Sequence, residues 1–492
     1  MSVKKSLLLL ALVLFVWVVY SYFTWGLQVP FKVKILERND SNHDGAIDTW
    51  RLDAVSWKGH VNVIEIDSDH DGRVDRLQIG NSEIRILNAS PQPEGSSRRK
   101  LIVCLDGVPY EDIASLWDQG HFREFARPGK LISSFPSLSD VALTEALHTA
   151  PVPGYENLYF DVQRNQIAGG ATSTLSKVRM PYLEVLDYDE PGVFKGLAYI
   201  IPIKTYRADL GRFLKKYCRS TLTEFKAHIC STDSICHVMS REEFRRYLLE
   251  VDSLLREIYV EQQGQLDFIV FSDHGNSHVQ NRRMDLENFL SRHGFNLEPS
   301  IRNERSVVYP GFGLVGALPL YCQPQSAEKL ANALSGLEGV DFSVYLDHGG
   351  VRIASSNGTA SIRAIDSGKR LKYILDEGDP LLLKSVIDRM SKQNQFDSEG
   401  FASCESWFEA TAEHEYADAV NTIYRGVTNH VTNRASLLVS LKDGYHYGSA
   451  FFDKLVTMRS THGNLRSSSM TGFFMRNGPA TRKVMSSREL LM

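Results

Sequence analysis

Four stretches of the sequence carry acidic residues and histidines where such side chains can bind a metal ion. They are "LDG", "DSICH", "SDHG" and "THG", which contain Asp106, Asp233, His237, Asp273, His274 and His462. Asp233 and His237 are four residues apart, so a helical turn would place both on one face. Taken singly, each Asp would indicate only a turn or a helix cap. Together the carboxylates and imidazoles suit two divalent transition-metal ions, and Zn²⁺ is the ion that we expect.

Two of these stretches end apolar runs that show no alternation. "KLIVCLDG" ends at Asp106 and "LDFIVFSDHG" ends at Asp273 and His274. Unbroken apolar strands followed by loops and helices are typical of a parallel sheet that is covered on both faces. Binding residues collect beyond the carboxyl ends of such strands. We therefore expect an α/β fold with a mainly parallel sheet flanked by helices.

The order "LDG", "FPSLS", "DSICH", "SDHG" and "THG" resembles the alkaline phosphatase superfamily, most closely its type I phosphodiesterase and nucleotide pyrophosphatase branch. The resemblance spans roughly residues 100–477 but is confined to these motifs. It implies an alkaline phosphatase-like core with two metal sites. One ion would be held by Asp106, Asp273 and His274, and the other by Asp233, His237 and His462. Ser139, in "FPSLS", takes the place of the nucleophile.

The residue types are consistent with that reaction. A dication can lower the pKa of a bound serine hydroxyl, so Ser139 would be both a metal ligand and the nucleophile. Two ions about 4 Å apart can hold the attacking and leaving oxygens in line. We therefore predict hydrolysis of phosphodiesters through a phosphoseryl intermediate on Ser139. Ser137, Asp140 and Thr144 are nearby alternatives, and an N-cap is the purely structural role for Ser139.

Other functions stay open at the level of sequence. The same superfamily includes phosphomonoesterases, phosphoryl-group transferases and sulfatases, although the C/S-x-P-x-R context of sulfatases is absent around Ser139. A function of another class is a calcium-dependent surface or scaffold protein whose enzyme domain is inactive. Metal content separates that class from the enzymes, because the ligand set predicts about two transition-metal ions per chain.

Two similar stretches, "NDSNHDGAIDTW" and "DSDHDGRVDRL", place oxygen-bearing side chains at alternate positions, as Ca²⁺ requires. The predicted calcium ligands are Asp40, Asn42, Asp44 and Asp48 in the first, and Asp67, Asp69, Asp71 and Asp75 in the second. Arg51 and Gln78 stand where an EF-hand has its bidentate Glu, and the stretches more closely resemble dockerin-like or thrombospondin type 3-like loops. Acidic β-turns in solvent are the alternative.

The N-terminus is strongly apolar. After Lys4 and Lys5 no charged residue occurs before Lys32, which is long enough for a helix of about 20 residues to cross a bilayer. We predict an uncleaved transmembrane signal anchor, with a cytoplasmic N-terminus and an extracytoplasmic (periplasmic, extracellular or lumenal) catalytic domain; a cleaved signal peptide is the alternative. The six cysteines would then face an oxidising space, with pairings that the sequence does not determine.

Composition is that of a globular protein, with 492 residues of which 43% are hydrophobic and 23% charged. The net charge of −4 gives no basic excess, so we expect no nucleic-acid partner. The resemblance implies a phosphate-ester substrate, and the apolar N-terminus predicts the membrane as a partner. Alternating apolar residues near 340–375 are typical of antiparallel strands. The predicted units are an anchor (1–30), a calcium-loop module (31–90), a linker (91–99), a catalytic domain (100–480) with an inserted α+β subdomain (about 295–440), and a tail (481–492).

Overall fold

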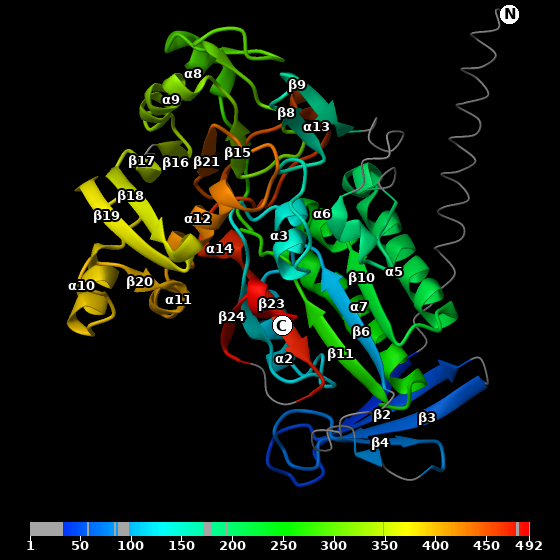
Figure 1. Cartoon of the computed structure of the whole chain (residues 1–492). Helices are drawn as coiled ribbons and strands as arrows, with labels where there is room; N and C mark the ends of the chain where they lie inside the picture. Colours follow the sequence, from blue (N-terminus) through cyan, green and yellow to red (C-terminus); the bar gives the residue numbers. More distant parts are fainter. Residues whose placement is uncertain are drawn as a thin grey trace, which may run out of the picture.

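The computed structural model describes residues 33–56, 59–82, 85–86, 98–170, 180–191, 195–347, 349–478 and 482–491. Within this part the chain is a mixed α/β protein whose three largest sheets have five, six and seven strands (Figure 1). The six-stranded sheet lies centrally, with the N-terminal sheet below it in the view and the seven-stranded sheet to its left. The expected α/β architecture is thus present.

The central sheet carries the strands that the sequence predicted to be buried. In spatial order its strands are β10 (Glu224–Ile229), β6 (Arg99–Leu105), β11 (Leu266–Phe271), β23 (Thr471–Arg476), β7 (Gly129–Ile132) and β24 (Val484–Ser486). β6 pairs in parallel with both β10 and β11, and β7 pairs in parallel with β24. β23 is antiparallel to both of its neighbours, so it alone runs against the other five.

Strand β6 is buried on both faces. Leu101, Val103 and Leu105 belong to one hydrophobic core, whereas Ile102 and Cys104 belong to another. Helices α2 (Tyr110–Asp118), α5 (Pro202–Arg219) and α7 (Arg241–Glu261) contribute to the first core, and α3 (Ser139–Ala146) contributes to the second. Two covered faces explain why the strand shows no polar alternation and why its first acidic residue comes at its carboxyl end.

The seven-stranded sheet is antiparallel and lies within the segment predicted as an inserted subdomain. Its strands are β15 (Ala317–Leu320), β21 (Leu437–Leu441), β16 (Val340–Asp347), β17 (Gly350–Ser355), β18 (Gly358–Ile365), β19 (Arg370–Gly378) and β20 (Ala402–Ser403). Its accompanying helices are α9 (Ala327–Leu334), α10 (Lys384–Lys392), α11 (Cys404–Thr411) and α12 (Ala419–Thr428). The sheet shares the second hydrophobic core with α3. It is therefore packed against the central unit, by which we mean the six-stranded sheet and the helices that cover it.

The N-terminal sheet packs on the central unit. Its antiparallel strands are β1 (Val33–Asn39), β2 (Thr49–Ser56), β3 (Gly59–Ile66), β4 (Arg76–Ile79) and β5 (Arg85–Ile86). Trp50, Leu52 and Val63 join the core formed by α2 and α7. The buried Arg256 of α7 pairs with Glu65 of β3, and its Nε lies 3.1 Å from Oε1 of Glu124. Hydrophobic contacts and an ion pair therefore both connect this sheet to the rest of the chain.

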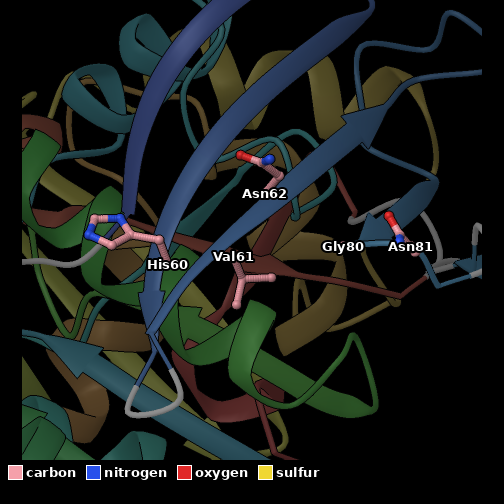
Figure 2. A pocket seen from close by; sticks show the side chains of 5 residues that line it. All are labelled: His60, Val61, Asn62, Gly80 and Asn81. Atoms are coloured by element: carbon pink, nitrogen blue, oxygen red, sulfur yellow. The ribbon is translucent and has the colours of Figure 1, made fainter.

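A pocket on the N-terminal sheet is lined by His60, Val61, Asn62, Gly80 and Asn81 (Figure 2). None of these is a predicted metal ligand.

Smaller elements complete the described part of the chain. They are the strand pairs β8 (Leu158–Asp161) with β9 (Gln166–Gly169), β12 (Arg282–Arg283) with β22 (Tyr445–His446) and β13 (Asn296–Leu297) with β14 (Ser306–Val307), and the helices α6 (Ser231–Val238), α8 (Leu286–Arg292), α13 (Ala450–Leu455) and α14 (Ser467–Met470).

The prediction of a membrane-anchored protein has to be corrected. In the part of the chain that the structure describes, no helix is both long enough and apolar enough to cross a bilayer. Helices α5 and α7 have 18 and 21 residues but carry charged side chains along their length. The predicted anchor, residues 1–30, lies outside the described residues. The predictions of a signal anchor, a membrane partner and an extracytoplasmic location therefore find no support in this structure.

The cysteines show no pairing in this structure. All six lie within the described residues, and all six are free. Cys230 and Cys236, which are close in sequence, are both buried as thiols.

Candidate active site

Three adjacent parallel strands bring five of the predicted metal ligands to one edge of the central sheet. Asp106 directly follows β6, and Asp273 and His274 come just after β11. Asp233 and His237 lie on α6, which begins two residues after the end of β10. Because parallel strands end at the same edge, their carboxyl ends place these side chains together. The sixth, His462, reaches the group from a loop that precedes α14, and all six side chains are buried.

Asp106, Asp273 and His274 form the first group. One donor atom from each lies within 4.8 Å of the other two. The Nε2 of His274 is 3.4 Å from Oδ1 of Asp106 and 3.5 Å from Oδ2 of Asp273. The backbone N–H of Gly107 donates to Oδ1 of Asp273, whereas the buried Oδ2 accepts no hydrogen bond from the described residues. A buried carboxylate oxygen without a donor is costly, so this oxygen fits a cation.

Asp233, His274 and His462 form the second group, again with donor atoms within 4.8 Å of one another. His237 joins it through Asp233, because its Nε2 is 3.0 Å from Oδ2 of Asp233. The Nε2 of His462 is 3.6 Å from Oδ1 of Asp233. The grouping differs from the predicted one in that His274 lies within both groups. The ring of His274 also stacks on that of His462, with centroids 3.8 Å apart, so the two groups are contiguous.

All three histidines are held in the same way. Each lies with Nδ1 at hydrogen-bond distance from a backbone carbonyl: His237 with Ser460 (2.7 Å), His274 with Gly275 (2.9 Å) and His462 with Ser137 (2.7 Å). When Nδ1 carries the proton and donates it, Nε2 keeps its lone pair and faces the carboxylates. This is the tautomer and orientation of a metal-binding imidazole.

The electrostatics of the cluster also favour a cation. Burial, together with the charge of Asp106, raises the pKa of Asp273 to about 6. Burial and the neighbouring His274 lower the pKa of His462 to about 3, so this imidazole is neutral. Burial opposes a charge on His274, but the carboxylates of Asp273 and Asp106 outweigh it and raise the pKa of His274 to about 10. The carboxylates therefore favour a positive charge between them, which a metal ion would also supply.

Ser139 is the first residue of α3, and its hydroxyl points toward the first group. Its Oγ donates to Oδ1 of Asp106 at 3.2 Å and lies 3.3 Å from Nε2 of His274. Leu138 occupies the N-cap position and makes no side-chain cap bond, so Ser139 does not serve as the N-cap. The hydroxyl is therefore directed toward the carboxylates and imidazoles.

The neighbouring alternatives have other partners. The Oγ of Ser137 donates to the carbonyl of Asn464 and accepts from the N–H of Gly463. The hydroxyl of Thr144 donates to the carbonyl of Asp140, and the Asp140 carboxylate accepts from the hydroxyl of Tyr182 at 2.5 Å. These contacts fix the segment around α3.

Sequence reasoning missed His228, the penultimate residue of β10. Its Nε2 is 3.0 Å from Oδ2 of Asp106, and its Nδ1 is 2.7 Å from Oδ1 of Asp189, which also pairs with Lys195. Burial opposes a charge on His228, but the hydrogen bonds with the two carboxylates outweigh it and raise its pKa to about 10. The sequence did contain a signal for His228, because it is a polar residue near the carboxyl end of a buried strand. The same criterion had identified Asp106.

Tyr199 and Asn276 were missed as well. The hydroxyl of Tyr199 donates to Oδ2 of Asp233 at 3.1 Å, and its ring lies 5.6 Å from that of His237. The amide of Asn276 donates to Oδ1 of Asp233 at 3.3 Å. Asn276 follows "SDHG" directly, but no pattern in the sequence marks Tyr199. His278, which had no predicted role, has its Nε2 2.5 Å from Asp112 and belongs to a separate ion-pair group.

The two predicted calcium loops join neighbouring strands of the N-terminal sheet, β1 to β2 and β3 to β4. Asp67, Asp69 and Asp71 have oxygens within 4.8 Å of one another. In the first loop, Asp40 accepts from the N–H groups of Asp44 and Gly45, and the Asn42 amide donates to Asp44. Asp48 and Asp75 accept hydrogen bonds from the backbone and hydroxyl of Ser41 and Ser68, respectively. These last two carboxylates therefore brace their loops.

No protein-family model and no curated protein matches this sequence. Among solved structures, human ectonucleotide pyrophosphatase/phosphodiesterase 5 is similar with a TM-score of 0.42 and 10% identity, over 80% of this chain and 92% of that chain. The murine protein gives 0.42 and 13%, over 80% and 93%. Phosphonoacetate hydrolase from Sinorhizobium meliloti 1021, in complex with phosphonoacetate, gives 0.42 and 10%, over 83% and 96%.

By their names, these neighbours are a nucleotide pyrophosphatase/phosphodiesterase and a phosphonoacetate hydrolase. Similarity at this level says nothing about the reaction, which has to be inferred from the side chains of the site.

Proposed function

We propose that this protein is a two-metal phosphoesterase that hydrolyses phosphodiesters through a phosphoseryl intermediate on Ser139. The observation that carries the proposal is the position of the Ser139 hydroxyl, 3.2 Å from Oδ1 of Asp106 and 3.3 Å from Nε2 of His274. A buried Asp/His cluster with a purely structural role does not require a hydroxyl at its edge. A nucleophile is needed there if the cluster holds ions that bind a phosphoryl group.

The donor set supports two borderline divalent ions. Carboxylates and imidazoles together suit Zn²⁺, whereas Ca²⁺ and Mg²⁺ prefer oxygen alone. The donor-free Oδ2 of Asp273 fits such an ion. Asp106, Asp273 and His274 would hold one ion, and Asp233, His237 and His462 the other, with His274 also within 4.8 Å of the donor atoms of Asp233 and His462. When bound, the ions would stabilise charge on the phosphoryl oxygens and lower the pKa of the Ser139 hydroxyl.

Residues behind the ligands support their orientation. His228 holds Oδ2 of Asp106, so that Oδ1 faces Ser139 and His274. Tyr199 and Asn276 donate to the two oxygens of Asp233. Hydrogen bonds of this kind fix the direction of ligand lone pairs and raise metal affinity.

Ser139 also starts a helix that is firmly held. Glu145 of α3 accepts from the Nε of Arg425 at 3.1 Å and from the Ser487 hydroxyl at 2.8 Å, and lies 2.7 Å from Nε2 of His430. The N-terminus of an α-helix favours the negative charge of a phosphoryl group. These contacts would keep the N-terminus of α3, and with it Ser139, in place during the reaction.

The reaction proceeds in two displacements. The Oγ of Ser139 forms a bond to phosphorus while the bond to the leaving-group oxygen breaks, which releases an alcohol and leaves a phosphoseryl ester. Water then attacks phosphorus on the side that the alcohol left, and the bond to Oγ breaks. The products are an alcohol and a phosphate monoester, and Ser139 regains its proton.

Replacing Ser139 tests this proposal. The Ser139→Ala variant should hydrolyse bis-4-nitrophenyl phosphate at least about 10³-fold more slowly than the wild type, because the covalent step is lost. Its transition-metal content, measured by mass spectrometry, should stay at about two ions per chain. Ser139→Thr is the matched control, since it keeps a hydroxyl and should retain part of the activity. Full activity in Ser139→Ala would remove Ser139 as the nucleophile.

The substrate class is tested with the wild-type enzyme. Diesters, 4-nitrophenyl phosphate and 4-nitrophenyl sulfate should be compared after loading with Zn²⁺, and the diester should give the highest kcat/KM. A higher value for the monoester or the sulfate would assign the enzyme to the corresponding alternative of the same superfamily. A chain without transition metal and without hydrolysis would instead support the scaffold alternative.

A further inference from the structure

Three acidic side chains lie close together in the loop between β3 and β4. Oxygens of Asp67, Asp69 and Asp71 lie within 4.8 Å of one another. Asp69 and Asp71 are exposed, but Asp67 is only 3% exposed. Its Oδ2 accepts from the N–H of Gly72 at 2.8 Å, whereas its buried Oδ1 has no hydrogen-bond partner among the described residues. A carboxylate oxygen in this position is costly unless a cation lies beside it.

The neighbouring arginines do not satisfy this oxygen. Arg123 donates to the carbonyl of Gly72, and its guanidinium lies 4.3 Å from the ring centroid of Trp117. Arg73 donates to the carbonyl of Gly478 at 2.8 Å. The charge of Arg123 attracts Asp67 and Asp71, but neither hydrogen bond reaches Oδ1 of Asp67, which therefore keeps no donor among the described residues.

We propose that Asp67, Asp69 and Asp71 bind one Ca²⁺ ion, and that the bound ion clamps the N-terminal sheet to the central unit. Three carboxylates with no nitrogen or sulfur donor form a hard, all-oxygen set, which Ca²⁺ prefers. In loops of this spacing the seventh position adds a backbone carbonyl, here that of Arg73, and water completes the coordination. The proposal is independent of the phosphoesterase function, because these residues lie outside the Asp/His cluster.

The clamp follows from what the loop touches. A Cβ placed on Gly72 would lie 2.7 Å from Nη1 of Arg123 and 3.1 Å from the ring of Trp117, and Gly72 has a φ of +87°. Trp117 is on α2, and Arg123 follows that helix. The N–H of Val74 donates to the carbonyl of Arg123 at 2.9 Å. The backbone of this loop thus lies directly against the central unit, and an ion that fixes the loop also fixes that contact.

The first loop provides an internal control with the same spacing. Gly45 has a similar φ of +96°, but a Cβ placed on it would meet nothing within 4 Å. Both oxygens of Asp40, the counterpart of Asp67, already accept hydrogen bonds from N–H groups of their own loop. Among the described residues, Asp40 therefore has no donor-free oxygen, and Gly45 lacks the close contact that Gly72 makes with Trp117 and Arg123.

Terbium luminescence tests the site in the full-length, Zn²⁺-loaded protein. Tb³⁺ substitutes for Ca²⁺ at oxygen sites, and Trp117 beside the loop can sensitise its emission. We expect emission that CaCl₂ displaces, with an affinity at least about tenfold weaker in Asp69→Ala. Asp69 is exposed and accepts a long hydrogen bond from the N–H of Asp71, at 3.4 Å, so this substitution does not endanger the fold. Removal of a carboxylate from the first loop, in Asp44→Ala, should leave binding like that of the wild type.

Two results would overturn the site: no emission that CaCl₂ displaces in the wild type, or unchanged affinity in Asp69→Ala. Loss of binding in Asp44→Ala alone would move the site to the first loop and equally contradict the proposal. Hydrogen exchange then tests the clamp. CaCl₂ should slow exchange in residues 67–75 and also in 117–125 in the wild type, and in neither segment in Asp69→Ala. Slowing confined to 67–75 would show that an ion binds but does not clamp.

Discussion

The Asp/His cluster of the central sheet and the acidic loop of the N-terminal sheet both contain a buried carboxylate oxygen without a donor, on Asp273 and on Asp67. They differ in what surrounds it. Asp273 belongs to a cluster with imidazoles and a serine hydroxyl, contributed by residues far apart in sequence. Asp67 is grouped with the carboxylate oxygens of residues two and four positions further along the chain. A site assembled by tertiary structure can combine nitrogen donors with a nucleophile. A single short loop instead supplies oxygen ligands, which suit a hard ion with a structural role.

Removing the transition-metal ions and replacing them with Zn²⁺ or Ca²⁺ should have the largest effect on activity. Dipicolinate should remove the transition metals and reduce diester hydrolysis at least about 100-fold, because no metal ion then stabilises the negative charge on the phosphoryl oxygens. Adding ZnCl₂ should restore the rate, whereas CaCl₂ alone should not. Restoration by CaCl₂ alone would show that the two sites do not differ in ion preference.

Substitutions of His274 and His237 test whether one histidine contributes to both metal sites. His274 lies within both donor groups, but His237 contacts only Asp233 among the predicted carboxylate ligands. His274→Ala should therefore lose both ions, and His237→Ala about one, as measured by metal analysis of purified protein. Circular dichroism controls for folding. Equal metal content in the two variants would show that His274 does not bridge the groups.

His228 should have a smaller effect, because it acts through Asp106 and not on the substrate. His228→Gln should lower kcat about 10- to 100-fold, as loss of a residue that orients a ligand generally does. KM should change little, and Zn²⁺ should bind more weakly. His121→Gln is a matched control, because His121 is also paired with a carboxylate, Asp252, in another part of the protein. An unchanged kcat and Zn²⁺ affinity in His228→Gln would exclude the positioning role.

A pH effect of modest size is expected where the N-terminal sheet meets α7. Burial raises the pKa of Glu124 to about 8, although Arg256 opposes this. Because the folded-state pKa lies above the ordinary value, the contribution of Glu124 to stability is full below about pH 4.5 and is lost as pH rises through about 8. The melting temperature should therefore fall between pH 6 and pH 9, and should fall less in Glu124→Gln. An equal fall in both proteins would assign the pH dependence to other groups.

Sequence reasoning found the parts of the site that have local signals. Asp106 and Asp273 end apolar runs, and Asp233 and His237 have helical spacing, so their proximity could be predicted from a parallel sheet. The membership of His274 in both groups and the role of Tyr199 could not, since both depend on distances between distant loops. The docking of the N-terminal sheet was missed for the same reason, because Arg256 and Glu65 lie 191 positions apart. The membrane prediction was drawn from the apolar N-terminus and the lysines before it, and no helix of the described residues supports it.

The stereochemical course at phosphorus tests the central claim most directly. A chiral phosphorothioate diester would be hydrolysed in ¹⁸O-labelled water, and the configuration of the product determined by NMR. Two successive displacements, first by Ser139 and then by water, predict overall retention of configuration. Inversion would mean that water attacks the diester directly, and would contradict the phosphoseryl intermediate.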